Sequence, residues 1–149
     1  MNLTRRTFLT AGAGAAAAAF FGSQPAFATL EDLNKAIGAY TGGAEAGEGP
    51  LTLTTPEIAE NGNSVPVSVL VESPMTEDDH VASVMILAEG NPLPDVATFH
   101  FSAMSGEAKA STRMRLAKTQ NVVAVAKMSN GDFYKVSNNV KVTIGGCGG

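Results

Sequence analysis

Hydrophobic and polar residues alternate along most of the chain between positions 51 and 144. In residues 65–71 every second residue is valine, and in residues 109–116 Lys, Ser and Arg alternate with Ala, Thr, Met and Leu. A period of two is typical of half-buried strands in antiparallel sheets. The chain is therefore expected to form mainly β-strands.

Eight such runs are separated by short segments rich in Pro, Gly, Asn and Ser, which favour turns. The expected strands are residues 51–54, 65–71, 81–89, 96–102, 107–117, 121–128, 133–137 and 140–144. Asn61-Gly62, Asn91-Pro92-Leu93-Pro94 and Asn138-Asn139 are among the expected turns. Many short strands, with no alternation of strands and helices, predict an all-β fold: an immunoglobulin-like antiparallel β-sandwich over residues 50–144.

One short helix is expected before the sandwich, at residues 29–38. Thr29 and Asp32 have the spacing of a capping box, and the apolar residues at 30, 33 and 37 share one helical face. Gly38 is the expected end of the helix. Residues 41–49, rich in Gly, Ala and Glu, indicate a linker. Residues 29–49 are thus assigned to an N-terminal helix and linker.

Residues 1–28 have the features of an export signal. Arg5-Arg6 is followed by Phe8-Leu9, an Ala/Gly-rich apolar stretch and the small-x-small sequence Ala26-Phe27-Ala28. Paired arginines in this setting resemble a twin-arginine signal, although Thr10 stands where a basic residue is usual. The apolar stretch of about 15 residues is short for a membrane anchor, which needs about 20. We expect cleavage before Thr29, and a periplasmic protein that is not anchored in a membrane.

The charge balance argues against nucleic-acid binding. Removal of residues 1–28 takes away two of the ten Lys and Arg residues and none of the 14 Asp and Glu, so the net charge changes from −4 to −6. A nucleic-acid-binding protein needs a basic surface. An acidic surface fits solubility or docking onto basic partner proteins.

The chain ends in Gly145-Gly146-Cys147-Gly148-Gly149, directly after the last expected strand. Four glycines cannot contribute to a core and lose much conformational entropy when ordered, so residues 145–149 are expected to form a flexible, exposed arm. Cys147 is the only cysteine of the chain. An unpaired cysteine in an oxidising compartment is expected to react with another molecule.

The arm contains no Lys, Arg or His that would activate the Cys147 thiol, so activation must come from a partner. This favours a covalent carrier that partner enzymes act on, without enzymatic activity of its own. The alternative is a structural or interaction module whose Cys147 only forms intermolecular disulfides. Thin glycine flanks (Gly145, Gly146, Gly148 and Gly149) suit entry of the thiol into a narrow channel.

Other chemistry has little support in the sequence. The two histidines, His80 and His100, belong to no metal-binding motif, and a zinc site needs three or four ligands. The serines lack a nucleophile-elbow setting, and the glycines of residues 42–49 do not follow a strand as in a phosphate-binding loop. We therefore expect no metal site and no cofactor.

The terminal Gly-Gly-Cys-Gly-Gly, the twin-arginine signal and several strand motifs together resemble the SoxY family, the carrier subunits of the bacterial sulfur-oxidation (Sox) system. The supporting motifs are Glu60-Asn61-Gly62, Val65-Pro66, Ser73-Pro74-Met75, Asn91-Pro92-x-Pro94, and residues 113–117 and 121–126. The resemblance implies an immunoglobulin-like sandwich that pairs with a SoxZ-like subunit as a heterodimer. It also implies that Cys147 carries thiosulfate-derived intermediates.

The same resemblance implies a set of partner enzymes. A haem enzyme of the SoxAX type would couple thiosulfate to the thiol, a manganese hydrolase of the SoxB type would release sulfate, and, where present, a SoxCD-type dehydrogenase would oxidise the remaining sulfur. Ubiquitin-like sulfur carriers also end in Gly-Gly, but they carry sulfur on a terminal thiocarboxylate in the cytoplasm. The signal sequence and Cys147 argue against that class.

Overall fold

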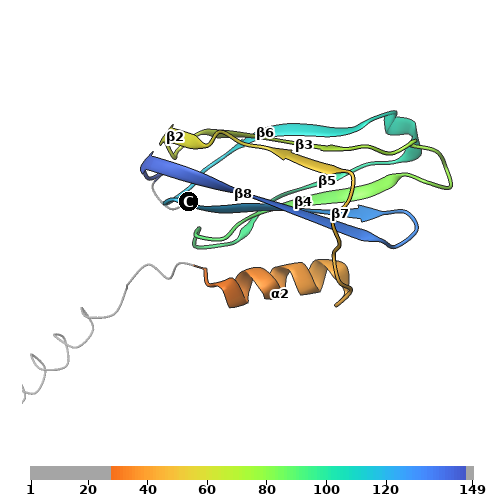
Figure 1. Cartoon of the computed structure of the whole chain (residues 1–149), viewed down its shortest axis with the longest axis horizontal. Coiled ribbons are helices and arrows are strands. Elements are labelled where there is room, and N and C mark those ends of the chain that lie inside the picture. Colours follow the sequence, from red (N-terminus) through yellow and green to blue (C-terminus); the bar gives the residue numbers. More distant parts are fainter. Residues whose placement is uncertain (1–27, 147–149) are drawn as a thin grey trace, which may run out of the picture.

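The computed structural model describes residues 28–146, which form two β-sheets and one long helix in three layers (Figure 1). The three-stranded sheet has the order β1-β3-β6, and the five-stranded sheet the order β2-β8-β7-β4-β5. The first sheet contains β1 (Leu51–Thr54), β3 (Val65–Val71) and β6 (Ala108–Met114). The second contains β2 (Ile58–Asn61), β4 (Val81–Ala88), β5 (Asp95–His100), β7 (Gln120–Met128) and β8 (Phe133–Ile144). The predicted sandwich is confirmed.

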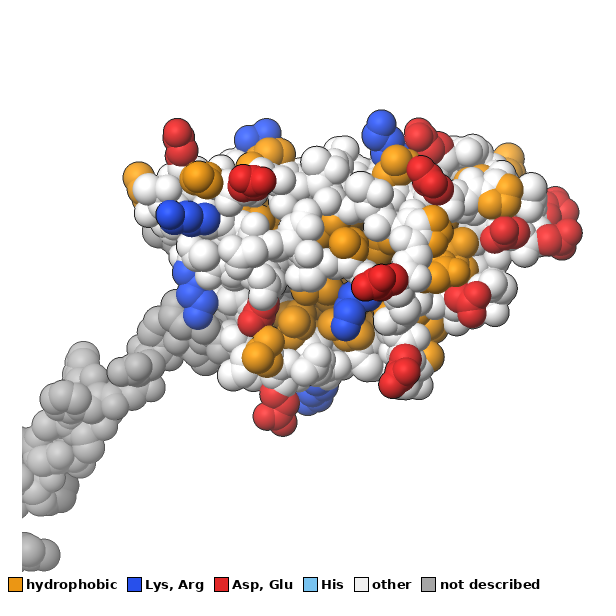
Figure 2. All heavy atoms as spheres, viewed as in Figure 1, with side chains coloured by type: hydrophobic (Ala, Val, Ile, Leu, Met, Phe, Trp, Pro, Cys, Tyr) orange, Lys and Arg blue, Asp and Glu red, His pale blue; other side chains and the backbone are white. Residues whose placement is uncertain are grey.

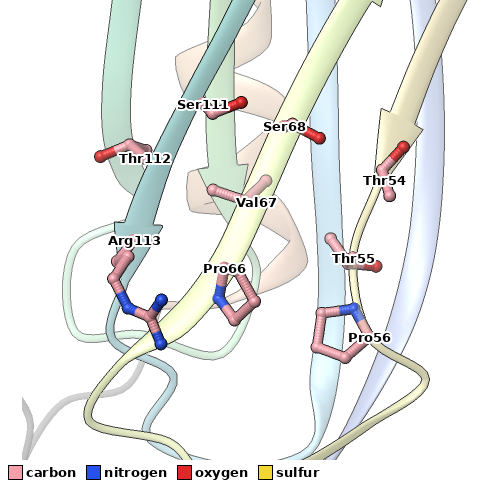
Figure 3. Close-up of a pocket in the computed structure, with 9 residues that line it drawn as sticks. All are labelled: Thr54, Thr55, Pro56, Pro66, Val67, Ser68, Ser111, Thr112 and Arg113. Carbon is pink, nitrogen blue, oxygen red and sulfur yellow. The ribbon is translucent and has the colours of Figure 1, made fainter.

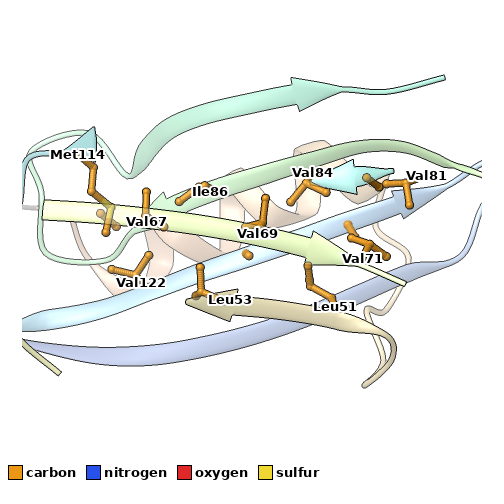
Figure 4. Close-up of a cluster of buried hydrophobic side chains, with 14 of the residues drawn as sticks. Leu51, Leu53, Val67, Val69, Val71, Val81, Val84, Ile86, Met114 and Val122 are labelled. Carbon is orange, nitrogen blue, oxygen red and sulfur yellow. The ribbon is translucent and has the colours of Figure 1, made fainter. Parts of the chain in front are cut away.

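The main core lies between the two sheets, and the alternation seen in the sequence produces it. The valines of β3 at 65, 67, 69 and 71 are at most 2% exposed. They pack against inward side chains of the five-stranded sheet, among them Val84, Ile86 and Val122 (Figure 4). The residues between the valines, Pro66, Ser68 and Leu70, face outward, as the period of two requires.

The helix α2 (Leu30–Thr41) forms the third layer, on the outer face of the five-stranded sheet. Thr29 and Asp32 make the predicted capping box. The helix continues through Gly38 and ends at Gly42, whose φ of 65° is left-handed, so the predicted end was wrong. An interior glycine lowers helix stability only modestly, and burial of the apolar helix face outweighs that cost.

A second hydrophobic cluster joins this helix to the sheet. Leu33 packs with Leu87, Val125 and Phe133, and Ile37 and Tyr40 lie at its margin. Strands β4 and β7 are therefore buried on both faces, which explains why their sequences are nearly continuous apolar runs.

Two strand assignments differ from the prediction. The expected turn at Asn138-Asn139 is wrong, because β8 runs unbroken from Phe133 to Ile144 and both asparagines pair with β7. Residues 58–61 form β2, which the sequence did not indicate and which pairs in parallel with β8. Asn138 Nδ2 donates to Leu53 O at 2.8 Å. The side-chain amide therefore joins β8 to β1 and does not stabilise a turn.

The surface is mostly polar. Acidic and basic side chains are interspersed over the face in Figure 2, with hydrophobic side chains between them. The large apolar side chains that remain exposed are Leu30, Ile58, Leu93, Met104 and Ile144. No helix within residues 28–146 has the length and hydrophobicity to cross a bilayer.

Candidate functional site

The chain leaves the sandwich through a set of backbone hydrogen bonds at the end of β8. Gly62 N–H donates to Ile144 O at 2.7 Å, and Leu116 N–H donates to Gly62 O at 2.8 Å. Gly146 N–H then donates to Leu116 O at 2.9 Å. We call Gly62, Leu116, Gly145 and Gly146 the exit slot. Three segments that are far apart in the sequence meet there and hold the residue to which Cys147 is bonded.

The exit slot has no room for side chains at its glycines. A β-carbon at Gly62 would overlap Leu116 O and lie 2.6 Å from Gly146 N. One at Gly145 would overlap Ala117 O, and one at Gly146 would lie 2.7 Å from Gly62 O. Side-chain carbons essentially never approach polar backbone atoms this closely, so these positions require glycine for close backbone contact.

This arrangement corrects one expectation about the arm. Gly145 is exposed as predicted, but Gly146 is buried and hydrogen-bonded, because the loop at residues 115–119 folds over it. Of the proposed arm, Cys147, Gly148 and Gly149 lie outside the described residues. The same is true of the expected signal, apart from Ala28. Gly146, the residue that precedes Cys147 in the sequence, is the last one that the exit slot binds.

Asn91 braces the exit slot from the loop between β4 and β5. Its Nδ2 donates to Arg115 O at 2.8 Å, and its Oδ1 accepts from Ala117 N–H at 3.1 Å and from Gln120 Nε2 at 3.0 Å. The buried Gln120 also accepts from Gly90 N–H at 2.6 Å. The sequence placed a turn at Asn91-Pro92 but contained no signal for these partners.

Both basic and acidic residues lie near the exit slot in the sequence: Glu60 stands two positions before Gly62. Arg113 donates from Nε to Ser64 Oγ at 2.6 Å and from Nη2 to Ser64 O at 3.1 Å, which ties β6 to the turn after β2. Arg115 is exposed beside Leu116, and Lys118 follows in the same loop. Arg115 and Lys118 are thus the basic side chains of the loop that binds Gly146.

A depression with a volume of about 600 Å³ lies elsewhere, on the outer face of the three-stranded sheet (Figure 3). It is lined by Thr54, Thr55, Pro56, Pro66, Val67, Ser68, Ser111, Thr112 and Arg113. Arg113 is its only ionisable lining group, and it already binds Ser64. The depression thus lacks the paired acid and base that a hydrolytic site would need.

The histidines do not form a site. His80 Nδ1 lies 3.0 Å from Thr76 O in a turn, whereas His100 is exposed at the end of β5. Over residues 28–146, no three His, Cys, Asp or Glu side chains gather in a way that could hold a metal ion.

Comparison with known proteins places the chain in a family. A family model described as "Sulfur oxidation protein SoxY" matches residues 37–147, so the matched region ends on the cysteine. The chain belongs to the SoxY family. The structure of the sulfur carrier protein SoxY from Chlorobium limicola f thiosulfatophilum is 34% identical and superposes with a TM-score of 0.63. That match covers 78% of this chain and 100% of the other. The predicted resemblance is confirmed.

More distant structures share only the sandwich. A superoxide reductase (neelaredoxin) from Ignicoccus hospitalis is 16% identical, with a TM-score of 0.56 over 62% of this chain and 79% of that one. One from Nanoarchaeum equitans is 14% identical, with a TM-score of 0.55 over 64% and 99%. A comparison with curated protein sequences gave no match. In this chain the exit slot lies next to Cys147, the carrier cysteine predicted from the sequence.

Proposed function

We propose that this protein is a periplasmic carrier that binds thiosulfate-derived intermediates covalently on Cys147 and presents them to partner Sox enzymes. The observation that carries the proposal is the position of Cys147. It is the only thiol of the chain, it ends the region matched by the SoxY family, and it is bonded to a residue held in the exit slot. The protein is a carrier subunit, and the chemistry is catalysed by its partners.

Loading of the carrier is a two-electron oxidation. The Cys147 thiolate and the sulfane sulfur of thiosulfate form an S–S bond, giving Cys–S–S–SO₃⁻, and two electrons pass to a haem partner of the SoxAX type. Hydrolysis by a SoxB-type partner breaks the bond between the sulfane sulfur and the sulfonate group. Water supplies the fourth oxygen of sulfate, a persulfide remains on Cys147, and two protons are released. Where a SoxCD-type enzyme is present, it would oxidise the persulfide.

The basic groups at the exit end support an anionic cargo. Arg115 and Lys118 lie in the loop that binds Gly146, close to where the sulfonate would be carried. Their positive charge would offset the negative charge of the sulfonate. In this proposal the carrier itself needs no cofactor for these steps.

Export and assembly complete the proposal. Arg5-Arg6 and Ala26-Phe27-Ala28 support twin-arginine export with cleavage before Thr29. A SoxZ-like subunit would form a heterodimer with the sandwich. The alternative is a module whose Cys147 only forms intermolecular disulfides. A thiosulfate-derived group bound to Cys147 would distinguish the carrier from that module.

The decisive experiment compares Cys147→Ser with the wild-type protein in reconstituted thiosulfate oxidation. Serine cannot form the S–S bond, so we expect activity to fall at least 1,000-fold. The melting temperature should stay within about 1 °C, because the change lies beyond the last strand. Thr143→Ser, an exposed change on β8, serves as the control and should retain activity.

Intact mass spectrometry of the loaded wild-type protein tests the attachment directly. We expect a mass increase of one thiosulfate group that reductant removes and that is absent from Cys147→Ser. Full turnover by Cys147→Ser would refute the carrier function. A wild-type protein that forms only disulfide-linked dimers, without thiosulfate adducts, would support the alternative.

A further inference from the structure

We propose that Asn91 is a positioning residue for the carrier arm: its single carboxamide holds the two peptide groups that anchor the exit slot. The inference rests on the proposed function, because it concerns where Cys147 is presented. Asn91 lies in the loop between β4 and β5, more than 50 residues before the arm, and neither strand contributes to the exit slot.

The two peptide groups are those on either side of Leu116. In the first, Arg115 O accepts from Asn91 Nδ2, and Leu116 N–H of the same peptide donates to Gly62 O. In the second, Ala117 N–H donates to Asn91 Oδ1, and Leu116 O of the same peptide accepts from Gly146 N–H. Asn91 therefore binds one side of each peptide, and the exit slot binds the other side.

Peptide planarity transmits this restraint. The N–H and C=O of a trans peptide point in opposite directions and rotate as one rigid unit. A rotation that lost the Asn91 bond would also turn Leu116 O away from Gly146 or Leu116 N–H away from Gly62. Hydrogen bonds linked through a shared peptide also polarise one another, so loss of one weakens the next.

An asparagine is the side chain that this geometry requires. The site needs one donor, for Arg115 O, and one acceptor, for Ala117 N–H, on the same planar group. Aspartate has the same shape but no donor, so it keeps the acceptor bond on the Gly146 side and loses the bond on the Gly62 side. The two halves of the brace can thus be separated by substitution.

The experiment compares Asn91→Ala with Asn138→Ala as a matched control. Asn138 is also partly buried and donates to a backbone carbonyl, Leu53 O, but it joins β8 to β1 away from the exit slot. Both variants should lower the melting temperature. The readouts that separate them are hydrogen exchange at the Gly146 amide, iodoacetamide alkylation of Cys147, and the KM for the carrier in reconstituted thiosulfate oxidation.

For Asn91→Ala we expect Gly146 exchange to be at least tenfold faster, and the KM to rise at least threefold, while alkylation changes by less than twofold. Asn91→Asp should accelerate Gly146 exchange less than Asn91→Ala does, and it provides a second variant if the alanine protein does not fold. Equal exchange and KM in Asn91→Ala and Asn138→Ala would overturn the proposal. Activity of Cys147→Ser would instead refute the carrier function, and the exchange data would still decide whether Asn91 positions Gly146.

Discussion

The two ends of the sandwich are built differently. At the exit end, hydrogen bonds join loops that are far apart in the sequence: Asn91 binds Arg115 and Ala117, 24 and 26 positions away, and Gly90 binds Gln120, 30 positions away. At the opposite end, most bonds stay within one turn. Asp79 N–H donates to Thr76 Oγ1 three positions away, and Asp132 N–H donates to Asn130 Oδ1 two positions away.

This difference shows that most hydrogen bonds between distant loops lie at the exit end. A turn that satisfies its own backbone can vary without moving its neighbours, whereas a loop braced by another loop cannot. Ser129 is the exception at the opposite end: its Oγ accepts from His80 N–H and donates to Asp78 O, and its N–H donates to His80 O. Ser129 itself is exposed, whereas Gln120 at the exit end is buried. The exit end is thus the more constrained one, and it is the end from which the proposed carrier cysteine emerges.

The largest expected effect comes from adding a β-carbon to one glycine at each end of the sandwich. Gly62→Ala should lower the free energy of unfolding by about 3 kcal/mol, because the new methyl group overlaps Leu116 O in the exit slot. Gly131→Ala, in a turn of the opposite end with φ of 93° and open space around it, should cost about 1 kcal/mol from backbone strain alone. Urea unfolding measures both. Equal losses would mean that the two ends are not differently constrained.

A second pair of variants removes, at each end, a side chain that accepts a hydrogen bond from a backbone N–H. Gln120→Ala leaves the Gly90 N–H without its partner in a buried site, so we expect a loss of about 2 kcal/mol. Ser129→Ala removes the acceptor for His80 N–H, but water replaces it at that exposed position, and the loss should be about 0.5 kcal/mol. Thermal unfolding of the two variants orders them, and the reverse order would contradict the comparison.

The smallest expected effect is a pH dependence at the start of α2, which joins the exit end through the bond from Ala28 N–H to Asn91 O. Hydrogen bonds from the backbone N–H and hydroxyl of Thr29, helped by Lys35, lower the pKa of Asp32. A lowered folded-state pKa means that this stabilisation is present above the unfolded pKa, about 3.9, and is lost as the pH falls through the folded value.

Melting temperatures of wild type and Asp32→Asn should therefore differ slightly at pH 6 and converge as the pH falls below about 4. Thr143→Ser, an exposed change on β8 that removes no titratable group, is the control and should leave the melting temperature unchanged at both pH values. A difference for Asp32→Asn that persists unchanged at low pH would argue against the capping carboxylate as its source.

Local features of the fold could be predicted from the sequence, whereas contacts between loops could not. The capping box at Thr29 and the valine alternation of β3 depend on neighbours within a few residues. The parallel pairing of β2 with β8 and the unbroken course of β8 through Asn138 depend on partners far away. Asparagine pairs favour turns on average, but here both asparagines pair with β7, and their side chains donate to Leu53 O and Asn121 Oδ1.

The same division applies to the candidate site. Cys147 and its glycines stood out because their composition is unusual wherever they lie. The burial of Gly146 could not be predicted, because glycine occurs both in flexible segments and where two backbone segments lie in close contact. The residue type alone does not distinguish these two cases. Asn91 was visible as a turn residue, but its partners belong to a loop more than 20 positions away.

The layer formed by α2 has an optical consequence. The chain has no tryptophan and two tyrosines, and neither lies in the three-stranded sheet. Tyr40 Oη lies 2.7 Å from Ser83 Oγ beneath the helix, where burial raises its pKa, and its ring meets Phe133 edge-on. The Tyr134 ring covers Gly49 of the linker. Alkaline phenolate absorbance of Tyr40 therefore reports on the attachment of the helix. Tyr134 also packs against the main core, so its fluorescence would respond if the three-stranded sheet came apart.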